Sequence, residues 1–410
     1  MDSNPGRKFS VHPSVVIMSD RLSNPKAYRV EGLATKPMSR LFFVVILFAA
    51  LWQGGETIGK DRGWAAAIAW RPDGQMIAIA STTGVWLFGS EFNELGHVQV
   101  KQTENDEPKQ GQAKQEWDLP HRSLSWNAAG DLLAVGDVRY GRTPIQIIDI
   151  GKLEVVSEIS TRLLAWTPIQ WHPADNLIVV GTYGGTAHIF DALTGEEVFY
   201  FVERKEGARG ALSNYTVGFC WFDEDVIVIA THHEIYVIDI ASKELLQTVD
   251  PDTVFDTTDC NREHQLITTN GKLYDIRTGS LISVFTEYDS HIDEFIWTLD
   301  VAWSPDGRRF VSSTEGCLVR VFDGGTGELL ARLSGGIHYE YQANSFFLSS
   351  IAWHPDGGSF AVVGQFGDIR VWDVKTYALL RRFDGFELFD EYTLLPYKTR
   401  EEFLEHECPE

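Results

Sequence analysis

The chain is poor in cysteine and has none of the short motifs that mark common enzymes. Four cysteines occur in 410 residues, and no two of them are close in sequence. They stand at positions Cys220, Cys260, Cys317 and Cys408. This spacing indicates small buried side chains rather than a disulfide framework or a zinc site. We therefore expect no metal and no other cofactor.

Linear catalytic motifs are absent. The sequence contains no G-x-S-x-G, no P-loop, no H-E-x-x-H and no G-x-G-x-x-G. These patterns place a nucleophile, a phosphate cradle, a zinc pair or a dinucleotide. Their absence leaves no nucleophile to name, so we predict that the chain is not an enzyme. A catalytic site assembled from residues of separated loops would carry no linear motif.

Basic residues are scarce relative to acidic ones. There are 35 Lys and Arg against 58 Asp and Glu, a formal net charge of −23. Residues 1–60 carry eight basic and four acidic groups, or +4, so the remainder carries −27. Such a field repels nucleic acid and anionic membrane surfaces. The charge serves solubility or attracts a basic partner.

Only one long hydrophobic run is present, at 41–52, preceded by Arg40. Twelve residues are too few to span a bilayer, which needs about 20. They fit the hydrophobic core of an export signal at 38–60, with Met38 as the true start and 1–37 as a disordered upstream extension. Alternatives are an uncleaved membrane anchor at 41–52 or a strand docked on the folded domain. We expect export or membrane anchoring, and otherwise a cytoplasmic location.

What the chain does contain is a phrase repeated about seven times. It reads IAWRPDG at 68–74, VAWSPDG at 301–307 and IAWHPDG at 351–357, with a degenerate copy, TDCNREH, at 258–264. The marker residues are Trp70, Trp126, Trp171, Trp221, Cys260, Trp303 and Trp353. They recur 39 to 56 residues apart. A period of this length with short strands predicts a ring or stack of small sheets, with the tryptophans packed between them.

One repeat, residues 349–383, shows the pattern of four strands. The segments SSIAWH, SFAVVG, IRVWDV and ALLRRF are short, apolar and separated by turns. Pro and Asp-Gly stand where the chain must reverse, because Pro presets φ and Gly tolerates positive φ. A single sheet of this kind cannot bury both faces, so it must pack on its neighbours.

The third strand of six repeats ends in an apolar residue followed by Asp. The pairs are Ile148-Asp149, Phe190-Asp191, Ile238-Asp239, Tyr274-Asp275, Phe322-Asp323 and Trp372-Asp373. On these residues the chain resembles the WD-repeat β-propeller family over about 64–383. The resemblance implies an all-β, seven-bladed propeller of four-stranded antiparallel blades at 61–383. The Gly-His of that family is missing, and Asp368 is the best surviving member of its hydrogen-bonded tetrad.

In such a ring, turns between strands one and two and between strands three and four share one face. These turns are short, so we name this the plain face. The blade-to-blade connections lie on the opposite, decorated face, and four are long: 101–122, 202–215, 286–298 and 334–348. Elaborated loops on a rigid scaffold carry function, and exposed aromatics anchor interfaces. The candidate partner-binding residues are Tyr288, His291, His338, Tyr339, Tyr341, Phe346 and Phe347. The alternative is that these aromatics cap the blades beneath.

The C-terminal extension, 384–410, carries nine acidic and two basic residues. Its first half is too apolar for a free tail and is expected to lie against the ring. Thr399 and Glu402 have capping-box spacing, which predicts a short helix.

The resemblance implies an interaction platform, because members of this family mostly act as such. We therefore expect a non-catalytic, monomeric ring that presents its decorated face to a protein or peptide. Two alternatives remain. One is an exported propeller enzyme or small-ligand receptor that uses the central channel, in which case His232, His291 and His338 would converge on the axis. The other is a structural ring within a larger assembly.

Overall fold

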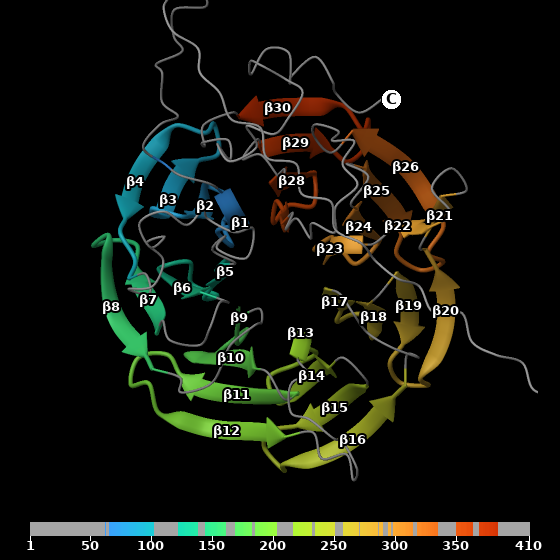
Figure 1. Cartoon of the computed structure of the whole chain (residues 1–410), viewed down its shortest axis with the longest axis horizontal. Coiled ribbons are helices and arrows are strands. Elements are labelled where there is room, and N and C mark those ends of the chain that lie inside the picture. Colours follow the sequence, from blue (N-terminus) through green and yellow to red (C-terminus); the bar gives the residue numbers. More distant parts are fainter. Residues whose placement is uncertain are drawn as a thin grey trace, which may run out of the picture. The chain divides into compact units, whose positions relative to one another are not determined.

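The computed structural model describes residues 62–383, except for 63–64, 102–121, 138–143, 161–168, 183–184, 203–215, 232–233, 251–256, 270, 286, 290–293, 297, 315–317, 335–349 and 364–368. All described residues belong to one compact unit, Thr57–Glu410. Seven four-stranded antiparallel sheets are arranged in a ring, which confirms the predicted seven-bladed propeller (Figure 1). The predicted leader at 1–60, the acidic extension at 384–410 and Asp368 lie outside the described residues.

Each blade is built from four strands that are consecutive in sequence. Blade 1 comprises β1 (Ala65–Trp70), β2 (Met76–Ser81), β3 (Gly84–Gly89) and β4 (Glu94–Val98). Blade 2 comprises β5 (Arg122–Trp126), β6 (Leu132–Asp137), β7 (Ile145–Asp149) and β8 (Glu154–Ile159). Blade 3 comprises β9 (Ile169–Trp171), β10 (Leu177–Thr182), β11 (Thr186–Asp191) and β12 (Glu197–Val202). Blade 4 comprises β13 (Thr216–Trp221), β14 (Val226–Thr231), β15 (Ile235–Asp239) and β16 (Glu244–Val249).

The remaining blades follow the same order. Blade 5 comprises β17 (Thr258–Asn261), β18 (Leu266–Thr269), β19 (Lys272–Asp275) and β20 (Ser280–Val284). Blade 6 comprises β23 (Thr298–Trp303), β24 (Arg309–Thr314), β25 (Leu318–Asp323) and β26 (Leu329–Ser334). Blade 7 comprises β27 (Ser350–Trp353), β28 (Ser359–Val363), β29 (Ile369–Asp373) and β30 (Leu379–Phe383). The first strand of each blade lies nearest the centre of the ring and the fourth lies at the rim (Figure 1).

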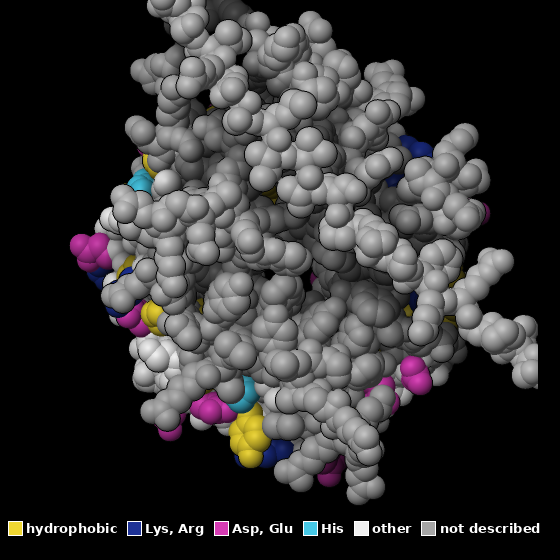
Figure 2. Space-filling model, viewed as in Figure 1, with side chains coloured by type: hydrophobic (Ala, Val, Ile, Leu, Met, Phe, Trp, Pro, Cys, Tyr) yellow, Lys and Arg dark blue, Asp and Glu magenta, His cyan; other side chains and the backbone are white. Residues whose placement is uncertain are grey.

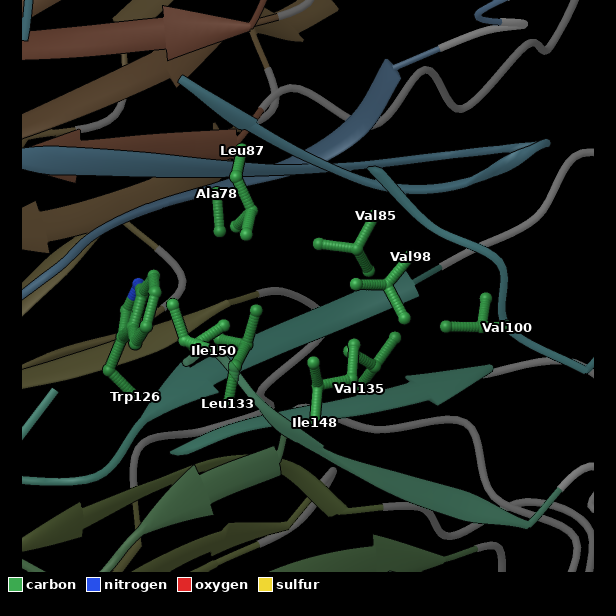
Figure 3. Packing of buried hydrophobic residues seen from close by; sticks show 10 residues of the cluster. All are labelled: Ala78, Val85, Leu87, Val98, Val100, Trp126, Leu133, Val135, Ile148 and Ile150. Atoms are coloured by element: carbon green, nitrogen blue, oxygen red, sulfur yellow. The ribbon is translucent and has the colours of Figure 1, made fainter. Parts of the chain in front are cut away.

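The hydrophobic core is divided among the seams between blades. Seven clusters of buried side chains occur, and each combines residues of two neighbouring blades. At the seam of blades 1 and 2, Ala78 and Leu87 face Leu133 and Ile148 (Figure 3). The second and third strands of the blades are therefore mostly apolar, as in β14 and β15, because both of their faces are covered by another sheet.

The repeated tryptophans occupy the ends of the inner strands, and three of the six donate a hydrogen bond to the preceding blade. Trp126 Nε1 donates to the carbonyl oxygen of Ala69 at 3.2 Å. Trp353 Nε1 makes the same bond to Ala302 at 3.0 Å. Five of the six tryptophans are at most 9% exposed. The prediction that they pack between blades is confirmed.

The Asp at the end of the third strand caps the turn that follows it. Asp191 Oδ1 accepts hydrogen bonds from the backbone N–H of Thr194 at 2.7 Å and from its hydroxyl at 2.9 Å. Asp323 and Asp373 repeat this arrangement with Thr326 and Thr376. The residue that marks the repeat in the sequence therefore fixes the plain-face turn between the third and fourth strands.

Blade 5, which contains the degenerate copy of the repeated phrase, has a first strand of four residues and one unexpected covalent bond. Cys260, which takes the place of the repeated tryptophan, is joined by a disulfide to Cys220 of blade 4, with 6.0 Å between the Cα atoms. Both residues are buried in the seam of blades 4 and 5. The expectation of unpaired cysteines was wrong for this pair. The two residues are 40 positions apart in sequence, and only the ring brings them together.

Between blades 5 and 6 the chain forms a short hairpin of β21 (Glu287–Asp289) and β22 (Glu294–Ile296). Blade 7 supplies its own outer strand, β30, as the sequence predicts. The ring closes where β1 lies beside β27 and β28. Within the described part of the chain, no helix has the length and hydropathy needed to cross a membrane.

Candidate functional site

The predicted partner-binding residues fall almost entirely outside the described residues. This applies to His291, His338, Tyr339, Tyr341, Phe346 and Phe347, and also to His232. Tyr288 is placed only by its backbone, which pairs with Phe295 in the β21–β22 hairpin. Each of the long segments joins the outer strand of one described blade to the inner strand of the next along the chain. The candidate residues themselves remain a prediction.

On the plain face, side chains of one blade bridge to the next. His172 Nε2 donates to the carbonyl oxygen of Glu224 at 2.8 Å, and Asn261 Nδ2 donates to that of Gly307 at 2.7 Å. His354 Nε2 lies 3.2 Å from the carbonyl oxygen of Gly74. Each acceptor belongs to the turn between the first and second strands of the following blade. The two histidines are therefore structural, as their place in the repeated phrase predicts.

Around the centre, hydroxyls and carboxylates of one inner strand accept hydrogen bonds from the backbone of the next. Ser123 and Ser125 of blade 2 accept from the backbone N–H of Ile169 and Trp171 in blade 3, at 2.9 and 2.8 Å. Asp259 of blade 5 accepts from Trp303 of blade 6 at 2.7 Å. These bonds tie the inner strands together where no ladder pairing is available.

Blade 6 has the same kind of hydrogen bond between inner strands, made by a second carboxylate. Asp300 of blade 6 accepts from the backbone N–H of Ile351 in blade 7 at 2.8 Å and from the hydroxyl of Thr257 at 2.9 Å. Burial raises the pKa of Asp300 to about 7 and that of Asp259 to about 6. Both side chains keep some exposed surface. The only signal in the sequence is the polar character of the degenerate copy at 258–264, which contains Asp259.

A cavity of about 340 Å³ lies at the seam of blades 7 and 1. Blade 1 contributes Trp70 from the end of β1 and Phe92 from the β3–β4 turn. Blade 7 contributes Val371 from β29 and Leu380 from β30. Because the remaining lining comes mainly from plain-face turns, the cavity belongs to the plain face. The volume lies at the lower end of the range for ligand sites.

The polar lining of this cavity is acidic on balance. Asp356 and Asp373 line it, and His354 and Arg381 are the basic groups. Arg381 forms an ion pair with Glu91 across the seam. A backbone hydrogen bond from Gly358 lowers the pKa of Asp356, and one from Thr376 lowers the pKa of Asp373. Both carboxylates are therefore ionised at neutral pH.

Sequence analysis missed this cavity because each of its residues already had a structural role in a turn or strand. Among the described residues, no group of three or more His, Cys, Asp and Glu side chains is arranged to hold a metal ion. In the view of Figure 2, the acidic and basic side chains of the described residues that can be seen lie around the rim of the ring.

Comparisons with known proteins agree with this architecture. The family described as "WD40: WD domain, G-beta repeat" matches residues 280–323, which run from β20 to the end of β25. No curated protein matches the chain. Among solved structures, the β-propeller domain of Cps50 (Swd1) from Myceliophteria thermophila is similar, with a TM-score of 0.58 and 17% identity over 78% of this chain and 100% of that domain. The seven blades and the capping aspartates show a seven-bladed β-propeller, and residues 280–323 match the WD-repeat family.

Proposed function

We propose that the protein is a non-catalytic scaffold that binds a protein or peptide partner on its decorated face. WD-repeat propellers generally act as protein-interaction scaffolds. The observation that carries the proposal is the asymmetry of this ring. Plain-face turns are short and tied to one another, as at His172 and His354. The long segments all connect an outer strand to the next inner strand, whereas the plain-face turns connect strands within one blade.

The proposed contact residues are those chosen from the sequence. Tyr339, Tyr341, Phe346 and Phe347 lie in the segment between β26 and β27, and Tyr288, His291 and His338 accompany them. Aromatic side chains supply most of the energy in protein interfaces. The net charge of −23 makes a basic partner the best match in charge.

A capture experiment tests the proposal. The full chain, immobilised, is compared with a variant carrying Tyr339→Ala, Tyr341→Ala, Phe346→Ala and Phe347→Ala. The control is Leu193→Ala, which removes an exposed side chain from a plain-face turn. We expect a partner to bind the unmodified chain saturably. The Leu193→Ala control should still bind this partner, and the loop variant should not. Retention of every bound protein by the loop variant would refute the decorated face as the binding surface.

We also propose that the protein is exported or membrane-anchored through residues 38–60. The Cys220–Cys260 disulfide supports this, because disulfides persist mainly in oxidising compartments. Alkylation of free thiols before and after reduction, followed by mass spectrometry, tests it on protein from its native cells. Two cysteines protected until reduction would support export, and free thiols at both positions would oppose it.

A further inference from the structure

The cavity between blades 7 and 1 combines an apolar wall with two carboxylates, Asp356 and Asp373, each of which has one oxygen without a partner among the described residues. Asp356 and Asp373 each use Oδ1 to hold a turn, at 2.7 Å from the backbone nitrogens of Gly358 and Thr376 respectively. Within the described part of the chain, no hydrogen bond or ion pair engages either Oδ2. Asp356 is also well exposed, since 68% of its side-chain surface is accessible.

The one Arg that lines the cavity does not neutralise these acids. Arg381 pairs with Glu91, so this pair contributes no net charge. His354 Nδ1 lies 2.8 Å from Asp356 Oδ1, so the Oδ2 atoms of Asp356 and Asp373 are the acceptors left for a ligand. Trp70, Phe92 and Leu380 provide apolar surface. A ligand that matches both features has an apolar stem and a cationic head. Lysine and arginine side chains have this form, because their methylene stems pack on apolar surface while the head stays polar.

The same seam already holds an arginine of the chain itself. The Arg62 guanidinium lies 5.0 Å from the ring centroid of Trp86, 5.4 Å from Phe88 and 6.0 Å from Phe383. It also pairs with Glu94. The boundary of blades 7 and 1 therefore combines aromatic rings with a carboxylate to bind a basic side chain. The cavity offers Trp70 and Phe92 with two carboxylates.

We propose that this cavity is a second binding site, which accepts a lysine or arginine side chain of a basic partner. The stem lies against Phe92 and Leu380, and the head approaches Asp356 and Asp373. The site is on the plain face, so it goes beyond the scaffold function proposed for the decorated face. The two proposals are independent, so one can be refuted while the other holds.

Small probes test the site directly on the full chain. Nα-acetyl-arginine methylamide and Nα-acetyl-lysine methylamide are titrated by ligand-observed NMR. Nα-acetyl-norleucine methylamide, which has a similar stem without charge, is the control ligand. We expect saturable binding of the two cations that is at least about tenfold tighter than that of norleucine, a factor equal to about 1.4 kcal/mol. Binding should weaken as salt is raised.

Matched variants locate the binding. Asp356→Asn with Asp373→Asn removes both charges but keeps an amide oxygen to cap each turn, and should weaken cation binding about tenfold or more. The control is Asp306→Asn with Asp323→Asn, which changes the equivalent turns of blade 6 and should leave binding intact. Arg381→Gln should tighten binding, because it leaves Glu91 without its ion-pair partner and makes the charge around the cavity more negative.

Three results would overturn the proposal. They are the absence of saturable binding, equal binding of norleucine, and equal loss in both double variants. Thermal unfolding of both double variants shows whether they are folded. The loop variant described above should bind these probes like the unmodified chain, which separates failure of this site from failure of the decorated face.

Discussion

At the residue scale, the turn between the third and fourth strands of each blade requires one residue with positive φ. Glycine fills this position at Gly195, Gly279 and Gly327, with φ between 68° and 73°. Lys243 and Tyr377 fill it in blades 4 and 7, with φ of 62° and 58°. A side chain with a Cβ pays a steric cost there that glycine avoids. The turns therefore differ in steric strain, although they share the same backbone conformation.

Substitutions at this turn position should stabilise the protein in blade 4 and destabilise it in blade 3. Lys243 is exposed, so Lys243→Gly removes strain without removing a buried contact and should raise the free energy of unfolding by about 0.5–1 kcal/mol. Gly195→Ala introduces the strain, with no clash beyond ordinary contact at 3.7 Å, and should lower it by about 1 kcal/mol. Chemical denaturation measures both. Lys243→Ala is the control and should change little; a destabilised Lys243→Gly variant would contradict the argument.

Cys260 stands in blade 5 at the position that tryptophan occupies in the other six blades. The tryptophans at equivalent positions reach the preceding blade by packing and hydrogen bonding, as Trp126 and Trp353 do. In blade 5 a covalent bond to Cys220 makes this connection instead. The disulfide therefore compensates for the blade with the shortest strands, in which β17, β18 and β19 have four residues each.

Removal of this bond should be costly. Cys220→Ala with Cys260→Ala should lower the free energy of unfolding by about 2–4 kcal/mol, the usual range for a disulfide. Denaturant curves with and without dithiothreitol measure it, since the reductant should weaken the unmodified chain and leave the double variant unchanged. Cys317→Ala is the control. Identical curves for the unmodified chain in both conditions would show that the bond does not form.

At the scale of elements, the inner strands are tied together by acids as well as by serines. The raised pKa values of Asp259 and Asp300, about 6 and about 7, mean that folding favours their protonated forms. The ordinary aspartate value is 3.8. Their contribution to stability is therefore greatest below pH 4 and is lost as pH rises through 6 to 7. The exposed turn aspartates, such as Asp373, have lowered pKa values and behave in the opposite way, losing their contribution as pH falls below about 4.

Asp300→Asn tests this pH dependence. Between pH 5 and 8 the free energy of unfolding of the variant should fall less steeply than that of the unmodified chain, by roughly 1–3 kcal/mol over the range. Urea denaturation at a series of pH values measures the slope. Asp323→Asn, in an exposed turn, should leave this slope unchanged and act only at lower pH. Equal slopes for Asp300→Asn and the unmodified chain would show that Asp300 does not titrate in this range.

The elements differ in how far the sequence could predict them. The inner strands ending in Trp and the third strands ending in Asp were predictable, because the same local pattern recurs and each blade repeats the same packing. The β21–β22 hairpin was not, since strands of three residues carry too little pattern to recognise. The disulfide and the cavity at blades 7 and 1 were not predictable either. Both depend on residues of different blades meeting, which local sequence does not encode.

At the scale of the molecule, the ring must join two blades that are far apart in sequence. Ser350 of β27 accepts a hydrogen bond from the backbone N–H of Ile68 in β1, at 3.4 Å and 282 residues away. Arg62 adds to this closing seam. Its side chain is 5% exposed and lies against rings of both blades, Trp86 of blade 1 and Phe383 of blade 7. The pairing of Arg62 with Glu94 keeps its charge compensated.

We therefore expect Arg62→Ala to weaken ring closure. The free energy of unfolding should fall by about 2 kcal/mol, because a buried cation loses its contacts with aromatic rings and Glu94 loses its partner. Arg71→Ala is the matched control. Arg71 is more exposed and pairs with Asp73 beside it in sequence, so its loss should cost no more than about 0.5 kcal/mol. Denaturant unfolding of the two variants side by side measures the difference. If both variants lose the same free energy of unfolding, the apolar cluster and the backbone contacts alone close the seam between blades 7 and 1. Arg62 then contributes nothing to ring closure.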